Sequence, residues 1–182
     1  MKSDFFVIQE MYTPQECAEI RNVIERHINP AFVDQPAAGV TKTVEASGCL
    51  FGPCRQHLER YRNAVINVNK MVFGLDLFEI SDFDILNYNR YTEQKQGEYG
   101  WHKDSVVNEC RDIKLTAILN LSEQNYTGGE FYFHLNQPRH VPEISTPGTL
   151  LIFPSWTQHK VEPITSGERI SMSMWFAGPN LK

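Results

Sequence analysis

Long apolar runs are missing from this sequence of 182 residues. No stretch approaches the ~18 apolar residues that a membrane-spanning helix needs, so we expect no membrane partner and no transmembrane segment. The first apolar run, Phe5-Phe6-Val7-Ile8, has only four residues and is too short for the core of a secretory signal. The sequence therefore predicts a cytoplasmic protein.

Cysteine and positive charge are also scarce. The four cysteines, Cys17, Cys49, Cys54 and Cys110, form no CxxC pair, so we expect reduced thiols, with a Cys49–Cys54 bridge as the open alternative. Lysine and arginine number 17 against 22 acidic residues, which gives a net charge of −5. This acidic balance argues against a nucleic-acid partner, because such a partner needs a basic face.

The composition is that of a folded globular chain. It is 41% hydrophobic and 21% charged, which excludes a disordered protein. A chain of this length buries roughly 70% of its unfolded surface and needs no disulfide to stay folded. We expect a single domain over residues 1–182, with a helical support region at about 1–77 and a β core at about 78–178.

The first third of the chain shows helical signals. Thr13-Pro14-Gln15-Glu16 is a capping box with proline at the first helical position, and it predicts a helix from Pro14 to His27. A second helix is predicted from Gln56 to Val72, ended by Gly74. Between them, residues 31–53 read as a long loop with one strand at Thr41–Val44.

From Phe78 onward the pattern changes to short strands separated by turn signals such as Thr127-Gly128-Gly129 and Thr146-Pro147-Gly148. The seven predicted strands are Phe83–Asn89, Tyr99–Lys103, Leu115–Leu121, Glu130–Leu135, Thr149–Phe153, His159–Glu162 and Arg169–Phe176. Such spacing indicates a mainly β fold of the jelly-roll kind, with the N-terminal helices packed on one sheet.

The first chemical signal is the triplet His102-Lys103-Asp104 in a predicted strand. Residues i and i+2 of a strand point to the same side, so His102 and Asp104 offer an imidazole and a carboxylate to one point. His159 follows another apolar strand and can complete a set of two histidines and one carboxylate, which is typical of non-haem Fe(II) oxygenases. The triplet alone is weak, because a lone histidine is more often a surface or core residue. Glu130 and His134 are weaker alternative ligands.

The second signal is Arg169, which opens a strand whose alternate residues are apolar. Ile170, Met172 and Met174 form the apolar set, so Arg169 and the serines should face the other side. A buried arginine is costly unless it meets an anion. The distal carboxylate of 2-oxoglutarate is a suitable anion, and a salt bridge on a solvent-facing strand is the alternative.

Over residues 83–177 the chain resembles the 2-oxoglutarate/Fe(II)-dependent oxygenases of the prolyl 4-hydroxylase-like branch. The resemblance rests on segments that arrive in the family's order. They are Tyr88 and Tyr99 through Asp104, Leu115–Leu121, Gly128-Gly129-Glu130, Pro147–Ser155, His159–Pro163 and Gly167-Glu168-Arg169.

This resemblance implies a double-stranded β-helix that uses Fe(II), O2 and 2-oxoglutarate, with ascorbate as a possible support. It assigns residues as follows: His102, Asp104 and His159 to iron; Arg169, Tyr88 and Ser173 to the co-substrate; Tyr99 and Trp175 to the substrate pocket. Asn120 departs from the pattern, since some relatives place a tyrosine there against the co-substrate.

The implied activity is hydroxylation of a C–H bond with release of succinate and CO2, most simply on a prolyl residue of a peptide or protein. Trp175 supports this choice, because nucleic-acid demethylases of the family carry a second arginine six residues after the first. The loop from about 33 to 51 is expected to clamp the substrate. A free amino acid or small metabolite as substrate, or a non-catalytic metal-binding jelly roll, are the alternatives. The sequence predicts no oligomeric state.

Overall fold

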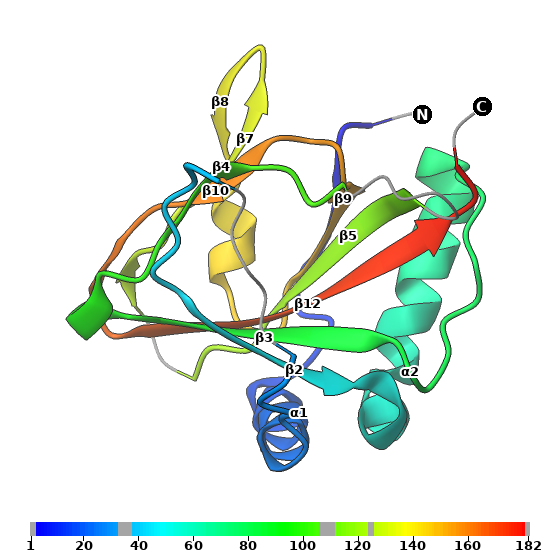
Figure 1. The fold of residues 1–182 in the computed structure, drawn as a ribbon, viewed down its shortest axis with the longest axis horizontal. Coiled ribbons are helices and arrows are strands. Elements are labelled where there is room, and N and C mark those ends of the chain that lie inside the picture. The colour runs from blue at the N-terminus through cyan, green and yellow to red at the C-terminus, as the bar shows by residue number, and fades with distance from the viewer. Residues whose placement is uncertain (1–2, 33–37, 106–111, 124–125, 181–182) are drawn as a thin grey trace.

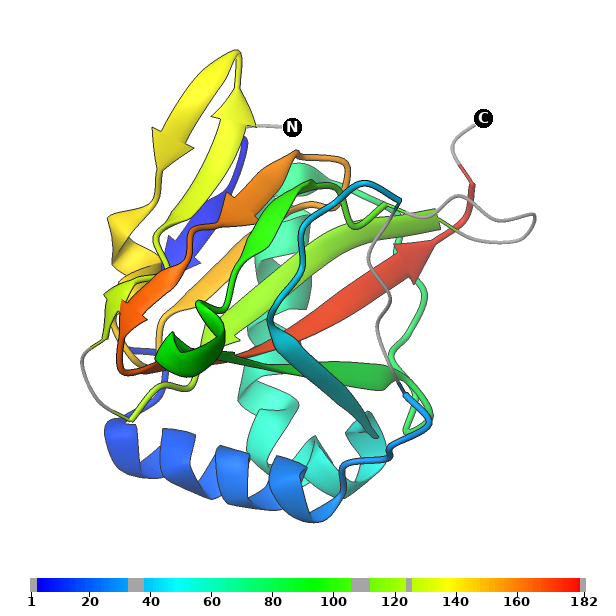
Figure 2. The same ribbon diagram turned by 60° about the vertical axis from the view of Figure 1, so that its left-hand side comes forward.

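The computed structural model describes residues 3–32, 38–105, 112–123 and 126–180, which form two facing antiparallel sheets with helices on the outside of one of them (Figures 1 and 2). The main sheet runs in the order β1 (Phe6–Ile8), β9 (Leu150–Pro154), β5 (Asp112–Asn120), β12 (Glu168–Gly178), β3 (Ile85–Thr92) and β2 (Glu45–Leu50). The minor sheet runs β4 (Tyr99–His102), β10 (His159–Val161), β7 (Phe131–Leu135) and β8 (Gln137–His140). The short strands β6 (Thr127–Gly128) and β11 (Ile164–Ser166) pair with each other. The predicted jelly-roll class is confirmed.

Two helices cover the outer face of the main sheet (Figure 1). Helix α1 (Pro14–Arg26) begins at the predicted capping box, in which Glu16 N donates to Thr13 Oγ1 at 3.2 Å and Thr13 N donates to Glu16 Oε2 at 2.8 Å. Helix α2 (Phe51–Val68) continues into a π-helical turn, η1 (Asn69–Phe73), and ends at Gly74, whose φ is 66°. Across the described ranges, no helix is long and apolar enough to cross a membrane.

Helix α2 begins at Phe51 rather than at the predicted Gln56. Gly52 and Pro53 gave the appearance of a loop. Both lie in the first helical turn, where proline loses no hydrogen bond because the N–H groups of that turn have no partner within the helix. The predicted helix therefore started about one turn too late, because a glycine and a proline are also common in loops.

The strand boundaries show similar differences. The strand expected at Thr41–Val44 lies instead at Glu45–Leu50, where β2 pairs with β3 along its whole length. Strands β1 and β8 were not predicted, and β8 carries Pro138, which an edge strand tolerates. Two 3-10 turns, η2 (Glu93–Lys95) and η3 (Pro142–Ser145), complete the described elements.

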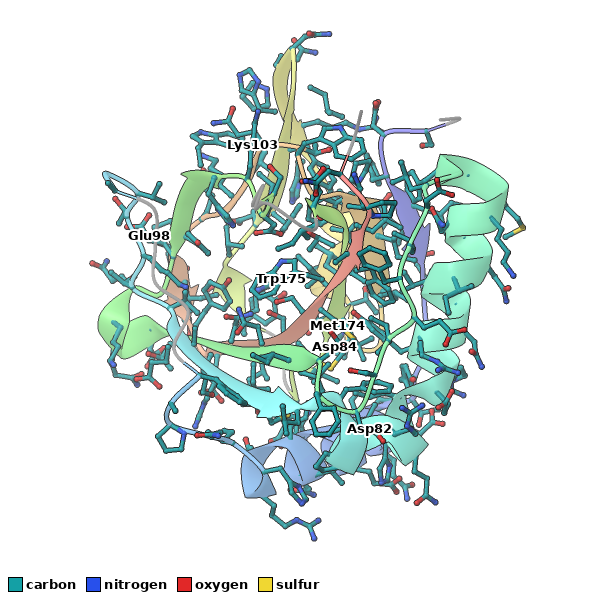
Figure 3. All side chains as sticks on the ribbon, turned by 45° about the vertical axis from the view of Figure 1, so that its right-hand side comes forward. Asp82, Asp84, Glu98, Lys103, Met174 and Trp175 are labelled. Atoms are coloured by element: carbon teal, nitrogen blue, oxygen red, sulfur yellow. The ribbon has the colours of Figure 1, made fainter. Side chains whose placement is uncertain are left out.

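The core has two parts, one on each face of the main sheet. Between this sheet and the helices, Ile170, Met172 and Met174 of β12 pack in an apolar cluster that includes Leu58 and Val65 of α2. Arg169, Ser171, Ser173 and Trp175 lie on the opposite face of β12, toward the minor sheet, so the predicted alternation is confirmed; Figure 3 shows Met174 and Trp175 on opposite sides of the strand. A second apolar cluster fills part of the space between the sheets; its members include Ile118, Phe131, Phe133, Phe153 and Val161. The remaining space holds the candidate site.

Candidate metal centre

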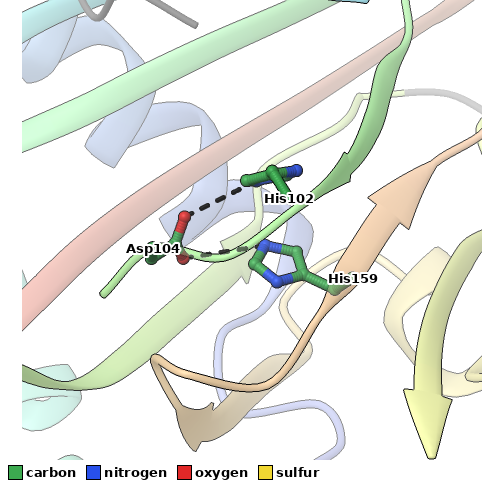
Figure 4. Close-up of side chains that lie close together, drawn as sticks. All are labelled: His102, Asp104 and His159. Atoms are coloured by element: carbon green, nitrogen blue, oxygen red, sulfur yellow. Dashed lines mark ion pairs between the residues drawn. The ribbon is translucent and has the colours of Figure 1, made fainter. Parts of the chain in front are cut away.

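Two histidines and one aspartate meet between the two sheets. His102 ends β4, Asp104 follows two residues later, and His159 begins β10; the pairing of β10 with β4 sets His159 opposite His102. Figure 4 shows the three side chains pointing toward one another, with Asp104 Oδ1 3.5 Å from His102 Nε2 and Asp104 Oδ2 3.6 Å from His159 Nε2. One potential ligand atom of each residue lies within 4.8 Å of the other two. The residues that the sequence placed 57 positions apart are thus neighbours in space.

Backbone carbonyls orient both imidazole rings. His102 Nδ1 lies 2.8 Å from Gly100 O, and His159 Nδ1 lies 3.0 Å from Thr157 O. A carbonyl oxygen only accepts hydrogen bonds, so each Nδ1 carries the proton. Each Nε2 therefore presents a lone pair toward Asp104, which is the tautomer that metal-ligating histidines commonly adopt.

The ionisation states also suit a divalent cation. Burial raises the pKa of Asp104, but attraction to His159 and contacts with His102 and Thr116 outweigh it and lower that pKa to about 2. Burial lowers the pKa of His159 to about 4, against the smaller raising effect of Asp104. At neutral pH the carboxylate is therefore charged and His159 neutral, as metal binding requires. This donor set, with both rings aimed inward, fits the ferrous facial triad.

Aromatic rings hold the imidazoles in place. Tyr99 stacks on His102 with ring centroids 3.5 Å apart, and Phe131 stacks on His159 at 5.4 Å. Lys42 Nζ lies over the ring of Tyr99, 4.7 Å from its centroid. Tyr99, expected in the substrate pocket, therefore lies beside a predicted metal ligand and lines the same cavity.

The three residues open into a cavity between the sheets. Its polar lining comes mainly from β3 and β12, and its apolar lining from the minor sheet and β5. Besides His102, Asp104 and His159, the lining residues are Asn87, Asn89, Tyr91, Tyr99, Ile118, Phe131, Val161, Arg169, Ser171, Ser173 and Trp175.

Arg169 is the most unusual lining residue, because the residue is only 1% exposed and its guanidinium is incompletely bonded. Its Nη1 donates to Ser171 Oγ at 3.3 Å, while Nε and Nη2 have no hydrogen-bond partner among the described residues. The ring of Tyr91 lies 5.0 Å below the guanidinium carbon. A buried cation with free donors is costly in the empty protein, and a carboxylate is the group whose two oxygens match this donor pattern.

The other residues predicted to hold the co-substrate divide into two groups. Ser173 lines the cavity and lies 3.2 Å from Asn89 Nδ2, which donates to it. Tyr88 lies on the opposite face of β3, where its hydroxyl donates to Glu25 Oε1 at 2.7 Å within the helix-side core. Tyr88 therefore points away from the cavity, and its predicted role in co-substrate binding is wrong. Tyr91 is the tyrosine of β3 that lines the cavity. Strand parity relative to Asn89 was the signal that could have identified it.

The remaining candidates lie outside the cavity. Glu130 and His134 are exposed and belong to no metal-type cluster in the described part of the chain. Asn120 is buried, and its Nδ2 donates to Ile144 O at 2.8 Å and to Ser145 O at 2.9 Å. Cys49 and Cys54 are free thiols with their sulfurs 3.7 Å apart, so the bridge considered for them is absent.

The segment predicted to clamp the substrate is fixed in part to the two sheets, and its role as a clamp stays a prediction. Its last third is β2, which is fixed in the main sheet. Before β2, Thr41 O accepts a hydrogen bond from Gly100 N at 2.8 Å, so this part of the segment lies against β4 beside the metal centre. Residues 33–37 and Cys110 lie outside the described residues.

Known proteins resemble the chain in sequence. Residues 86–177 match the 2OG-Fe(II) oxygenase superfamily. A PKHD-type hydroxylase of Acaryochloris marina is 31% identical over 175 residues, which cover 92% of this chain and 75% of that protein. A PKHD-type hydroxylase of Shewanella oneidensis is 37% identical over 93 residues, and the match spans only 48% of this chain and 40% of the length of that relative.

Solved structures share the fold at lower identity. A prolyl-4-hydroxylase of Pseudomonas putida superposes with a TM-score of 0.69 at 20% identity, covering 97% of this chain and 94% of that one. A prolyl hydroxylase of Trichoplax adhaerens, in complex with a hypoxia inducible factor peptide fragment, gives a TM-score of 0.68 at 14% identity, covering 95% and 83%. These likenesses show the fold, and the sequence match shows the family: the chain belongs to the 2OG-Fe(II) oxygenase superfamily.

Proposed function

We propose that this chain is an Fe(II)- and 2-oxoglutarate-dependent dioxygenase that hydroxylates a C–H bond. One observation carries the proposal: a single cavity is lined by both the His102, Asp104 and His159 cluster and the incompletely bonded guanidinium of Arg169. A purely metal-binding role would not explain the buried arginine, and a purely structural role of the arginine would not explain the nearby triad. The combination suits a metal that shares its site with a dicarboxylate.

In this proposal each residue has a separate task. His102, Asp104 and His159 hold Fe(II), and Arg169 with Ser173 and Tyr91 binds the distal carboxylate of 2-oxoglutarate. When bound, the metal supplies the oxidative chemistry in which O2 and 2-oxoglutarate yield succinate, CO2 and one oxygen atom inserted into the substrate C–H bond. Ile118, Phe131 and Val161 exclude water from the other side of the cavity.

The proposed substrate is a prolyl residue of a peptide or protein. The solved structures of similar fold include prolyl hydroxylases, one of them with a peptide bound. Trp175 offers an aromatic wall at the cavity, and its buried Nε1–H has no acceptor among the described residues. The amide-rich lining from Asn87 and Asn89 also suits a small polar molecule, so a free amino acid is the second candidate. The cytoplasmic location stays a prediction.

The test has two readouts. Purified protein is incubated with Fe(II), 2-oxoglutarate and ascorbate, first alone and then with proline-containing peptides or free amino acids, while succinate is quantified. We expect iron-dependent succinate formation that Asp104→Ala abolishes with little change in thermal unfolding of the metal-free protein. Succinate formation that is equal in the variant, or absent in the wild type under every condition, would contradict the proposal.

Mass spectrometry then identifies the substrate class. A gain of one oxygen atom on a prolyl residue of a peptide supports the prolyl assignment. The same gain on a free amino acid, with unmodified peptides, would replace it by the second candidate.

A further inference from the structure

Two buried hydroxyl groups lie directly behind Asp104. Thr116, in β5, is 1% exposed, and Ser155, which follows β9, is fully buried. Thr116 Oγ1 donates to Asp104 Oδ2 at 2.8 Å, and the two hydroxyl oxygens lie 3.0 Å apart. Neither hydroxyl lines the cavity, so neither can contact a substrate there.

The direction of these hydrogen bonds follows from the number of protons. A threonine hydroxyl has one hydrogen, and Thr116 gives it to the ionised carboxylate. The contact between the two hydroxyls must therefore use the hydrogen of Ser155. The result is an ordered chain in which Ser155 donates to Thr116 and Thr116 donates to Asp104.

The backbone around Ser155 anchors the same carboxylate residue. Ser155 O accepts hydrogen bonds from Asp104 N and Ser105 N, each at 3.0 Å, while Ser155 N donates to Lys114 O at 3.0 Å. Asp104 lies beyond the end of β4, so no strand pairing fixes its backbone. Its position depends on these contacts with β5 and with the end of β9.

We propose that Thr116, oriented by Ser155, is a positioning residue that fixes the Asp104 carboxylate in the rotamer required for metal binding. The inference rests on the proposed function of the triad and adds to it a requirement for one specific hydroxyl. Removing a side chain that is hydrogen-bonded to a metal ligand typically lowers the metal affinity by 10- to 100-fold. The role of such a side chain is energetic as well as geometric, because a hydrogen bond to a charged group is stronger than one between neutral groups.

The chain offers matched variants for a test. Thr116→Val removes the hydroxyl and keeps the branched shape that suits a strand, and Thr116→Ser keeps the hydroxyl. Ser155→Ala removes only the outer donor. Thr149→Val is the control, because Thr149 is equally buried and its hydroxyl has no hydrogen-bond partner among the described residues.

The measurement is Co(II) affinity of the metal-free protein, by titration against a competing chelator, with the visible Co(II) spectrum and the thermal unfolding of the metal-free protein recorded for each variant. We expect Thr116→Val to lose about 10- to 100-fold in affinity and to change the spectrum, Thr116→Ser to restore both, and Ser155→Ala to show a smaller loss. The control should match the wild type.

Three results would overturn the inference, and they can be told apart. If the wild type binds Co(II) and Thr116→Val binds it equally well with the same spectrum, the positioning role fails while the proposed function stands. If the wild type itself binds no Co(II), the proposed function fails and the inference with it. Should Thr116→Val not fold, Ser155→Ala decides: affinity equal to that of the wild type would overturn the inference.

Discussion

The two faces of the main sheet differ sharply although the same strands build both. On the helix side, Met172 of β12 packs beside Tyr88 of β3, in an apolar core closed by α2. On the cavity side, Arg169 of β12 lies opposite Tyr91 of β3, among polar groups that are equally buried. One face buries apolar surface and stabilises the fold, while the other buries charge and hydroxyl groups at a cost in stability.

This difference shows which part of the molecule compensates for the energetic cost of the polar groups buried in the site. A cavity lined by an arginine with free donors, two histidines and an aspartate weakens the empty protein. The helix-side core offsets that cost, because the burial of its apolar side chains stabilises the fold. Substitutions on the two faces should therefore separate stability from binding, and the following predictions test this separation.

The largest effect is expected for Arg169→Met on the cavity face. Loss of the guanidinium removes the partner of the distal carboxylate, and truncating one member of such a buried charge pair typically costs about 2–5 kcal/mol of binding. Calorimetry of the metal-loaded variant should show 2-oxoglutarate affinity reduced by about 30-fold or more. The free energy of unfolding of the metal-free variant should not fall, since two unpaired donors have been removed. Unchanged affinity would mean that the anion binds elsewhere.

Met172→Ala on the helix face should have the opposite result. Met172 is fully buried, and shortening a buried methionine costs about 2–5 kcal/mol of unfolding free energy. Denaturant unfolding measures that loss, and calorimetry on the folded variant should give wild-type affinity for the metal and for 2-oxoglutarate. A weakened 2-oxoglutarate affinity would show that the two faces are coupled.

A smaller effect is expected from pH on the metal-free protein. The pKa of His159 is lowered from an unfolded value near 6.5 to about 4 by burial, so between these values the unfolded state binds more protons than the folded state. The contribution of His159 to stability is complete above pH 6.5 and is lost as the pH falls toward 4. The free energy of unfolding should therefore decrease as the pH falls across this range. His159→Asn should reduce the slope of the unfolding free energy against pH. An identical slope in the variant would contradict the assignment.

The smallest effects are expected from a matched pair on β3. Tyr88→Phe removes the hydrogen bond to Glu25 and should cost about 1 kcal/mol of unfolding free energy without changing 2-oxoglutarate affinity. Tyr91→Phe, on the cavity face, should weaken 2-oxoglutarate binding more than it changes stability. The reverse pattern would restore the role first predicted for Tyr88.

Strand periodicity explains how much of the molecule could be predicted. The alternation from Arg169 to Trp175 predicts which side chains share a face, and the H-x-D spacing predicts that His102 and Asp104 converge. Tyr88 was assigned from the family resemblance, whereas alternation along β3 places Tyr91 with Asn89 on the cavity face. The first turn of α2 was hidden by Gly52 and Pro53, which are allowed at a helix start.

Contacts between distant segments could not be predicted at all. Thr116 and Ser155 are 39 residues apart, and only the pairing of β5 with β9 brings their hydroxyls behind Asp104. The strand β2 is weak in local propensity, with Gly48 at its centre, and it forms because β3 provides a complete hydrogen-bonding partner. Such elements depend on tertiary pairing rather than on their own sequence.

The central claim is that the metal cluster and Arg169 bind one molecule of 2-oxoglutarate together, and anaerobic calorimetry tests it most directly. If both ends of the molecule are held, 2-oxoglutarate should bind the Fe(II)-loaded protein more tightly than the metal-free protein, and by linkage it should tighten Fe(II) binding by the same factor. Equal 2-oxoglutarate affinity with and without Fe(II), or no binding in either form, would contradict the account.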